Sequence, residues 1–317
     1  MKKNLLVTLA DDNYIDQAKQ LFSSVYWNAG WKGDYLLLAY DIPNEKLHWF
    51  IEKGIIIKKC EKLPGYEFKR PTTGISKFKL FAPDFKNWRK IIYLDGDIIV
   101  RSSLDELTNV QNFAAVKDLG MPKLYHQFKG IKEVSPEKYD VLRTKYDLSA
   151  SAFNAGMFAF DTEIINQNTH NKLLGYLNEY MQPCFVDQPI LNMIFYKKWQ
   201  KLPLIYNVQM HFVKKAYKIR NIKGTVLHFT CKNKPWISGS KFCEEWQQNL
   251  KNSEKIDLSK KTEQKNENKY KIYYLVSIYK INHVFYLIDK LIGKIGGNIR
   301  KRHPKIYNNL RKIIYGK

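Results

Sequence analysis

Over the first 115 residues, apolar positions along the chain follow two alternating periods. Short continuous apolar runs, typical of buried strands, are separated by segments in which apolar residues recur every three or four positions, as on one face of a helix. The strand-like runs are 4–10, 34–41, 54–60 and 90–100, and the helix-like segments are 14–28, 44–53 and 77–85. Strands that alternate with helices are typical of βαβ units. The pattern therefore predicts an α/β fold with a mostly parallel central sheet covered on both faces.

After residue 112 the alternation is less regular. It predicts helices near 173–180 and 187–196 and a strand within 223–236 that breaks into a loop. Residues 249–271 are almost wholly polar or charged, which predicts a linker or a solvated helix. The expected organisation is a domain over 1–248, a polar linker over 249–271 and a basic amphipathic tail over 272–317.

The tail has the pattern of an amphipathic helix with a basic end. Apolar residues recur at spacings of four and three from Tyr274 to Ile295, and the run NIRKRHPK follows. Residues 251–317 carry 17 Lys and Arg against 5 Asp and Glu, so about half of the net charge of +23 lies there. This composition is typical of an anchor on an anionic membrane surface. A solvated helix and a helix seam of a homodimer are alternatives. Nucleic-acid binding is not expected, because the tail has no arginine-glycine repeats or zinc knuckles.

The four cysteines form no CxxC pair, which favours reduced thiols in the cytoplasm over a disulfide framework or a zinc site. The start MKKNLLVTLADD has too short an apolar run for a signal peptide and reads as a first core strand. No stretch of about 18 apolar residues predicts a spanning helix. The expected location is cytoplasmic, with peripheral attachment to the inner face of the cytoplasmic membrane.

Candidate chemistry is concentrated in the segment RKIIYLDGDIIVRS, residues 89–102. Asp95 and Asp97 stand one glycine apart between two apolar runs. Two carboxylates at the end of a buried strand cost free energy unless a cation lies between them, although a solvated turn is the alternative. Oxygen ligands suit Mn²⁺ or Mg²⁺, which in turn would bind the phosphates of a nucleotide. Asp11 and Asp12 follow another predicted strand, and ligands bind at the carboxyl edge of such sheets.

YLDGDIIV resembles the metal-binding core of glycosyltransferase family 8, which includes bacterial lipopolysaccharide galactosyl- and glucosyltransferases and the glycogenins. Further segments are similar to the family's motifs, in the same order, and together with this core they cover roughly residues 4–240. They are TLADDNY (8–14), SKFKL (76–80), FNAGMFAFD (153–161), DQPILN (187–192) and HFTCKNKPW (228–236). In the last segment, Cys231 stands where the family has a glycine, which affects how closely the backbone approaches a phosphate.

The resemblance implies a nucleotide-sugar-binding fold of the GT-A type. It also implies the transfer of a hexose, galactose or glucose, from a UDP-sugar to a glycan or glycolipid acceptor such as lipopolysaccharide, with retention of configuration. Mn²⁺ (or Mg²⁺) would be held by Asp95, Asp97 and His228. Carried over by position, the remaining roles are Asp11 and Asn13 at the uracil and ribose, Lys79 near the phosphates, Asp118 and Asn154 near the donor sugar, Asp187 and Gln188 at the reacting face, and Lys234 at the departing diphosphate.

Each of these residues also has an ordinary structural interpretation. His228 ends an apolar strand and alone would be a buried core histidine. Asp187 and Gln188 precede Pro189, as in a helix N-cap, and Asp11 is placed to cap the helix that follows it. Asn154 fits a simple turn, and Lys234 fits a solvent-exposed loop.

Two other functions remain as alternatives. The first is a haloacid-dehalogenase-type phosphatase with Asp95 as nucleophile. That class usually places the motif near the N-terminus and needs a later acidic pair, which is not evident here. The second is a non-catalytic, membrane-anchored nucleotide-sugar-binding scaffold. It would require a broken metal site, whereas Asp95, Asp97 and His228 are all present.

Overall fold

The computed structural model describes residues 2–61, 73–180, 187–217, 224–232, 234–259 and 302–305. Within these residues, the strands form a seven-stranded sheet with the order β3-β2-β1-β4-β7-β6-β8 and a three-stranded sheet with the order β5-β10-β9. The strands of the large sheet are β1 (Leu5–Ala10), β2 (Asp34–Tyr40), β3 (Ile56–Cys60), β4 (Lys90–Leu94), β6 (Phe113–Lys117), β7 (Phe153–Asp161) and β8 (Trp199–Lys201). The small sheet contains β5 (Ile98–Val100), β9 (Val208–Gln209) and β10 (Val226–His228).

The large sheet is mostly parallel, which confirms the predicted α/β class. β1 pairs in parallel with β2 and β4, β2 with β3, and β6 with β8. Only β7 runs against its two neighbours, β4 and β6. The carboxyl ends of β1, β4 and β6 and the amino end of β7 therefore meet at one edge of the sheet.

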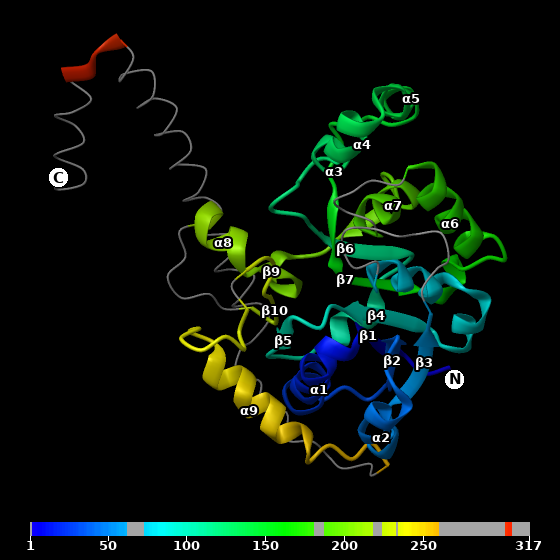
Figure 1. Ribbon diagram of the computed structural model, residues 1–317, viewed down its shortest axis with the longest axis vertical. Helices are drawn as coiled ribbons and strands as arrows, with labels where there is room; N and C mark the ends of the chain where they lie inside the picture. Colours follow the sequence, from blue (N-terminus) through cyan, green and yellow to red (C-terminus); the bar gives the residue numbers. More distant parts are fainter. Residues whose placement is uncertain are drawn as a thin grey trace.

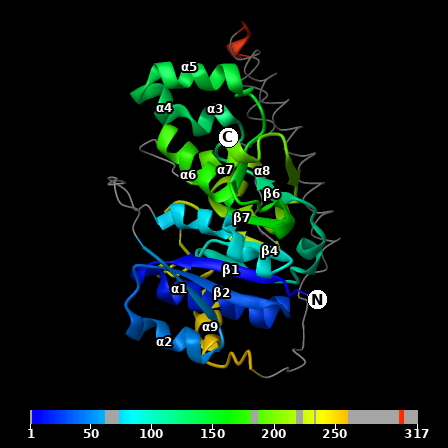
Figure 2. The ribbon, with the colours of Figure 1, turned by 90° about the vertical axis from the view of Figure 1, so that its right-hand side faces the viewer.

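Helices cover both faces of the sheet (Figures 1 and 2). On one side lie α1 (Ile15–Ser24), α2 (Asn44–Glu52) and α9 (Cys243–Ser253), and α1 continues into a π-helical turn over Val25–Ala29. On the other side lie α6 (Thr169–Glu179) and α7 (Asp187–Ile194). The remaining helices are α3 (Leu124–Gln127), α4 (Lys129–Val134), α5 (Pro136–Lys145) and α8 (Met210–Tyr217).

Alternate residues of β1 face two separate apolar cores. Leu6 and Ala10 belong to the core beneath α1 and α2, whereas Leu5, Val7 and Leu9 belong to the core beneath α6 and α7. A strand buried on both faces has no polar face to alternate with, which explains its continuous apolar run.

Two predicted elements differ from those observed. The helix predicted at 77–85 is a pair of 3₁₀ segments, Thr73–Phe81 and Pro83–Asn87, because a proline interrupts the helical hydrogen bonds between them. The strand predicted at 90–100 is two strands, β4 and β5, which belong to different sheets. The Asp-Gly-Asp triplet is the connection between the two sheets.

The polar linker was expected to begin at residue 249, but the folded part of the chain continues to at least Ser259. α9 runs to Ser253, and Asn249, Ser253 and Ile256 are buried. Trp27 Nε1 donates a hydrogen bond to the carbonyl of Asn252 at 3.2 Å. The composition is misleading because polar residues such as Asn249 and Ser253 are buried here, and because a backbone carbonyl accepts the hydrogen bond from Trp27.

The predicted tail over 272–317 lies outside the described residues, apart from 302–305. Among the helices that the structure describes, none combines the length and the apolar character needed to cross a membrane.

Candidate active site and metal centre

A cavity of about 370 Å³ opens at the edge where the strand ends meet. Seven of the residues predicted for the site line it, and they come from five separate segments of the chain. These residues are Asp95, Asp97, Asp118, Asn154, Asp187, Gln188 and His228. Lys77, Gly156, Phe212, Thr230 and Cys231 are among the other lining residues.

Asp95, Asp97 and His228 form a compact cluster, with one ligand atom from each within 4.8 Å of the others. His228 Nε2 lies 3.2 Å from Asp97 Oδ1 and 3.9 Å from Asp95 Oδ2. Strand pairing explains how residues so distant in sequence come together. β10 pairs antiparallel with β5, so that His228 stands opposite Ile98, the residue after Asp97.

The donor set fits a divalent cation. Two carboxylates and one imidazole suit Mn²⁺ or Mg²⁺. Asp97 Oδ1 is buried and accepts no hydrogen bond from any residue that the structure describes. Burying an oxygen atom without a hydrogen bond costs free energy unless the atom binds a cation.

Gly156 makes the cluster sterically possible. A Cβ at this position would lie 2.2 Å from His228 Cε1 and 2.8 Å from Asp95 Oδ2. Any other side chain would therefore displace the imidazole, the carboxylate or both. The Phe-Asn-Ala-Gly segment of β7 thus makes room for the cluster of Asp95, Asp97 and His228, a role that the sequence did not indicate.

Two lysines neutralise the carboxylates from opposite sides. Lys77 Nζ lies 2.7 Å from Asp187 Oδ2 and 3.0 Å from Asp95 Oδ1. Lys234 Nζ donates to Asp97 Oδ2 at 2.6 Å and to the carbonyl of Phe229 at 2.8 Å. The two ammonium groups therefore offset part of the negative charge of the three carboxylates.

The electrostatics of these groups follow from burial and pairing. Burial disfavours the charged form of Lys77, but the carboxylates of Asp187 and Asp95 outweigh burial and raise its pKa above the usual value. Burial also opposes ionisation of Asp97, yet His228, when its ring is protonated, and Lys234 hold the pKa of its carboxyl well below the usual range. In Lys234 the carboxylate of Asp97 outweighs burial, and the pKa is raised.

The lysine in the cavity is Lys77, not Lys79. Lys79 Nζ donates to the carbonyl of Lys59 at 3.3 Å, and Lys79 does not line the cavity. Both residues belong to the segment SKFKL, where the resemblance selected the second lysine. On a helical turn, residues two positions apart point in different directions, so only one of them can face the site.

The side of the cavity where the donor sugar is predicted to bind is a hydrogen-bonded network of amides. Gln188 Nε2 and Asn154 Nδ2 donate to Asp118 Oδ2 at 3.0 and 3.2 Å. Gln188 Oε1 accepts from the backbone of Ala155 at 2.9 Å. Asn207 Nδ2 donates to Asn154 Oδ1 at 2.9 Å. Asn207 is buried and belongs to no motif, so nothing in the sequence pointed to it.

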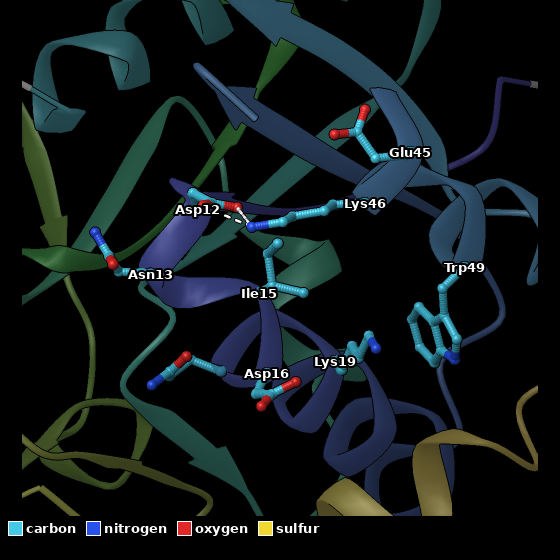
Figure 3. A pocket seen from close by; sticks show the side chains of 9 residues that line it. Asp12, Asn13, Ile15, Asp16, Lys19, Glu45, Lys46 and Trp49 are labelled. Atoms are coloured by element: carbon cyan, nitrogen blue, oxygen red, sulfur yellow. Dashed lines mark hydrogen bonds and ion pairs between the residues drawn. The ribbon is translucent and has the colours of Figure 1, made fainter. Parts of the chain in front are cut away.

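Asp11 and Asn13 lie outside this cavity. Asp11 Oδ1 accepts from the backbone of Asn13 at 3.0 Å, which is the capping role that the sequence left open. Asn13 lines a second cavity of about 470 Å³ between the starts of α1 and α2 (Figure 3). There, Lys46 Nζ lies 2.7 Å from Asp12 Oδ1.

Tyr14, a residue that sequence reasoning passed over, lies against the metal cluster. A Cβ at Gly96 would be 3.3 Å from Tyr14 Cδ1, and the ring of Tyr14 packs edge-on with that of Trp236. Burial raises the pKa of Tyr14, with Lys234 acting in the opposite direction. Tyr14 stands next to Asn13 within the segment TLADDNY, and this position was the feature of the sequence that could have pointed to it.

Cys231 retains a glycine-like backbone. Its φ is 64°, in the left-handed region that is unfavourable for side chains with a Cβ. The loop therefore has the conformation that a glycine would adopt, although the residue is cysteine. The thiol is exposed and lies at the cavity.

The fold is shared with solved glycosyltransferases. The galactosyltransferase LgtC, solved in complex with donor and acceptor sugar analogues, superposes with a TM-score of 0.59 at 18% identity, over 78% of this chain and 95% of that one. The order and direction of the strands are thus those of the GT-A fold, and the carboxylate and imidazole cluster at the edge of the sheet could bind a divalent metal.

Sequence comparison gives the family. Glycosyl transferase family 8 matches residues 5–240. The glycosyltransferase GlyB of Streptococcus pneumoniae is 27% identical over 278 residues, covering 78% of this chain and 61% of that protein. Galactinol synthase 2 of Arabidopsis thaliana is 29% identical over 211 residues, 62% of each. The chain thus spans about three fifths of the length of these relatives. It belongs to glycosyltransferase family 8, which confirms the resemblance and favours a transferase over the phosphatase alternative.

Proposed function

We propose that this glycosyltransferase moves a hexose, galactose or glucose, from a UDP-sugar to a hydroxyl group of a glycan acceptor with retention of configuration. Asp95, Asp97 and His228 would hold Mn²⁺ or Mg²⁺. The observation that carries the proposal is the convergence of these three side chains within 4.8 Å at the carboxyl edge of the sheet. When bound, the cation would neutralise the negative charge of the donor diphosphate.

The lysines on either side of the cluster are placed to bind phosphate oxygens. Lys234 Nζ contacts Asp97, and a fixed ammonium there would stabilise the charge that develops on the departing UDP. Lys77, on the opposite side, takes the place near the phosphates that the sequence assigned to Lys79. At the other end of the donor, the proposal keeps Asp11 and Asn13 for the uracil and ribose.

Asp118 and Asn154 are proposed to bind the donor sugar, with Asp187 and Gln188 at the reacting face. Their hydrogen bonds already fix the Gln188 amide at both ends, so it can orient a sugar without rearranging. Asp187 is paired with Lys77. That pairing disfavours attack by its carboxylate. We therefore favour attack by the acceptor on the same face that the UDP leaves, with the hydroxyl proton passing to the departing phosphate.

The proposed acceptor is a cell-surface glycan, such as lipopolysaccharide or another glycolipid. The basic tail over 272–317 is proposed to dock on the anionic inner face of the cytoplasmic membrane, where such acceptors are built. Replacing Arg300, Lys301 and Arg302 together by glutamate should release the full-length protein from vesicles that contain phosphatidylglycerol. Unchanged sedimentation with those vesicles would contradict the anchor.

A panel of UDP-sugars tests the function. With Mn²⁺ present, one of them should release UDP slowly even without acceptor, and EDTA should stop the release. The sugar product should keep the donor's anomeric configuration when followed by NMR. The Asp97→Asn variant serves as the matched control and should release none. Failure of every UDP-sugar at saturating Mn²⁺ would contradict the proposal and support a non-catalytic scaffold.

A further inference from the structure

A continuous chain of hydrogen bonds joins the donor-sugar side of the cavity to the metal cluster. Asn154 Nδ2 donates to Asp118 Oδ2 at 3.2 Å, and Asn207 Nδ2 donates to Asn154 Oδ1 at 2.9 Å. Asn207 Oδ1 then lies 2.9 Å from His228 Nδ1. Asn207 and His228 are both buried, and Asn207 has no exposed surface at all. Water therefore cannot substitute for these partners.

The direction of the chain is fixed at the Asp118 end. A carboxylate only accepts, and Asp118 accepts from two amide side chains and from the backbone of Met121. The amino group of Asn154 must therefore face Asp118, and its oxygen must face Asn207. The backbone N–H of Gly156 donates to the same Asn154 oxygen at 3.0 Å, which fixes that orientation independently.

The orientation of each amide group determines which atom the next side chain must turn toward it. Because Asn154 presents an oxygen, Asn207 must turn its amino group toward it. The oxygen of Asn207 is then the atom that faces His228, and it can only accept. His228 Nδ1 must consequently carry a hydrogen, which leaves the lone pair of a neutral imidazole on Nε2. Nε2 is the ring atom that faces Asp95 and Asp97.

Strand pairing places Asn207 where this is possible. Asn207 ends the 3₁₀ turn Leu204–Tyr206 and precedes β9, which pairs in parallel with β10. The register sets Val208 opposite Leu227 and Gln209 opposite His228. Asn207, two residues before Gln209, lies on the same side of the strand as Gln209, and its side chain reaches the imidazole diagonally.

We infer that Asn207 is a positioning residue. It holds His228 in the Nδ1–H tautomer, with Nε2 presented to a cation, and it transmits this constraint from Asp118. The donor-sugar side and the metal side of the cavity are then parts of one network. The inference rests on the proposed metal site, and its structural consequence, the tautomer, can be measured without metal.

Mn²⁺ affinity, measured by isothermal titration on the full-length protein, is the first test. Partners of a metal-binding histidine typically contribute ten- to a hundredfold to metal affinity, and Asn207→Leu should weaken binding by roughly that factor. Asn207→Asp, which keeps an acceptor for Nδ1–H, should recover most of the loss. The matched control is Asn249→Leu, at a buried asparagine in α9, which should leave the dissociation constant unchanged.

A double-mutant cycle tests transmission from Asp118. Asp118→Asn should weaken Mn²⁺ binding, although Asp118 is not one of the three ligands, because an amide no longer imposes one direction on the chain. In the Asn207→Leu background, the same change should add nothing. Additive losses, or a dissociation constant for folded Asn207→Leu within about twofold of wild type, would overturn the inference.

Nitrogen-15 NMR of the histidines in metal-free protein, at a pH where imidazole is neutral, is the second test. His228→Ala identifies the signal. Wild type should show a protonated Nδ1 and an unprotonated Nε2. Asp118→Asn should show a mixture of the two neutral tautomers of His228. A protonated Nε2 in wild type would overturn the inference. If wild type bound no Mn²⁺ but showed the expected tautomer, the metal proposal would fail and the positioning by Asn207 would stand.

Discussion

The two sides of the cavity differ in how their polar atoms are satisfied. On the side of Asp95 and Asp97, carboxylates lie against lysines, and Asp97 Oδ1 is buried without a hydrogen bond from any described residue. On the side of Asp118, Asn154 and Gln188 both donate with their amino groups and accept with their oxygens. The polar atoms of the amide side are thus paired with one another, whereas on the charged side Asp97 Oδ1 has no such partner among the described residues.

This difference has a mechanistic consequence. Groups that are already hydrogen-bonded in place can bind a sugar without reorganising, which is how a fixed polar environment lowers a reaction barrier. The charged side must instead exchange contacts, because a cation bound to Asp97 competes with Lys234 for the same carboxylate. The account therefore predicts that changes on the charged side act through the metal and through stability, and that they are large.

The largest effect is expected for Asp97→Ala. Loss of this ligand should reduce kcat by roughly a thousandfold or more, because both the cation and the partner of Lys234 are lost. Circular dichroism should show an intact fold. Turnover equal to that of wild type would contradict the assignment of the metal site.

Lys77→Met should mainly affect stability. It leaves Asp95 and Asp187 without the ammonium that neutralises both, and removal of one partner from a buried pair costs about 3 kcal/mol. The side chains of Asp95 and Asp187 are 28% and 20% exposed, which keeps the loss at the lower end of the usual range. The matched control is Lys79→Met, in the same segment and outside the cavity, for which the free energy of unfolding should hardly change.

The free energy of unfolding that Lys77→Met loses should depend on pH in a definite direction. The pKa of Lys77 is raised on folding, so its stabilisation is fully present below the unfolded-state pKa of about 10.4. The stabilisation disappears as the pH rises through the folded value. The gap in unfolding free energy between wild type and Lys77→Met should thus be constant around neutral pH and narrow only in strong alkali. A gap that closes near pH 7 would contradict the pairing.

Gly156→Ala should separate metal binding from folding. The added Cβ would meet the imidazole of His228, and the displaced ligand should weaken Mn²⁺ binding by about ten- to a hundredfold. At Gly175, in α6, an added Cβ meets no atom within 4 Å. Gly175→Ala should leave Mn²⁺ affinity unchanged and slightly stabilise the helix. Equal Mn²⁺ affinities for the two variants would mean that the close approach at Gly156 does not matter.

The smallest effect is expected for Cys231→Gly. Relief of the left-handed conformation should raise the free energy of unfolding by at most about 1 kcal/mol, since the more flexible unfolded chain offsets part of the gain. Cys231→Ala removes the thiol but keeps the unfavourable conformation, and it should not stabilise. Equal stabilisation by both variants would point to the thiol instead of the backbone.

The features that could be predicted from the sequence are those that depend on local patterns of residues. The two periods of apolar residues predicted the α/β class, and apolar runs on either side of Asp95 and Asp97 placed both carboxylates at the edge of the sheet. The resemblance supplied His228, which alone is indistinguishable from a core histidine. These features depend on neighbours in sequence or on motifs.

Contacts set by tertiary pairing were harder to predict. Whether Lys77 or Lys79 enters the cavity depends on the rotation of a 3₁₀ turn, which two similar residues in one segment cannot reveal. Asn207 reaches His228 only because β9 pairs with β10. The composition of the polar end of α9 predicts a linker, because buried polar residues cannot be distinguished from solvated ones by composition alone.

One divalent cation is proposed to bind between Asp95, Asp97 and His228. Anomalous X-ray diffraction from crystals grown with Mn²⁺ and UDP would locate it directly. We expect a single strong anomalous peak within bonding distance of one oxygen from each aspartate and of Nε2 of His228. No peak at saturating Mn²⁺, or a peak that contacts the aspartates while His228 points elsewhere, would contradict it.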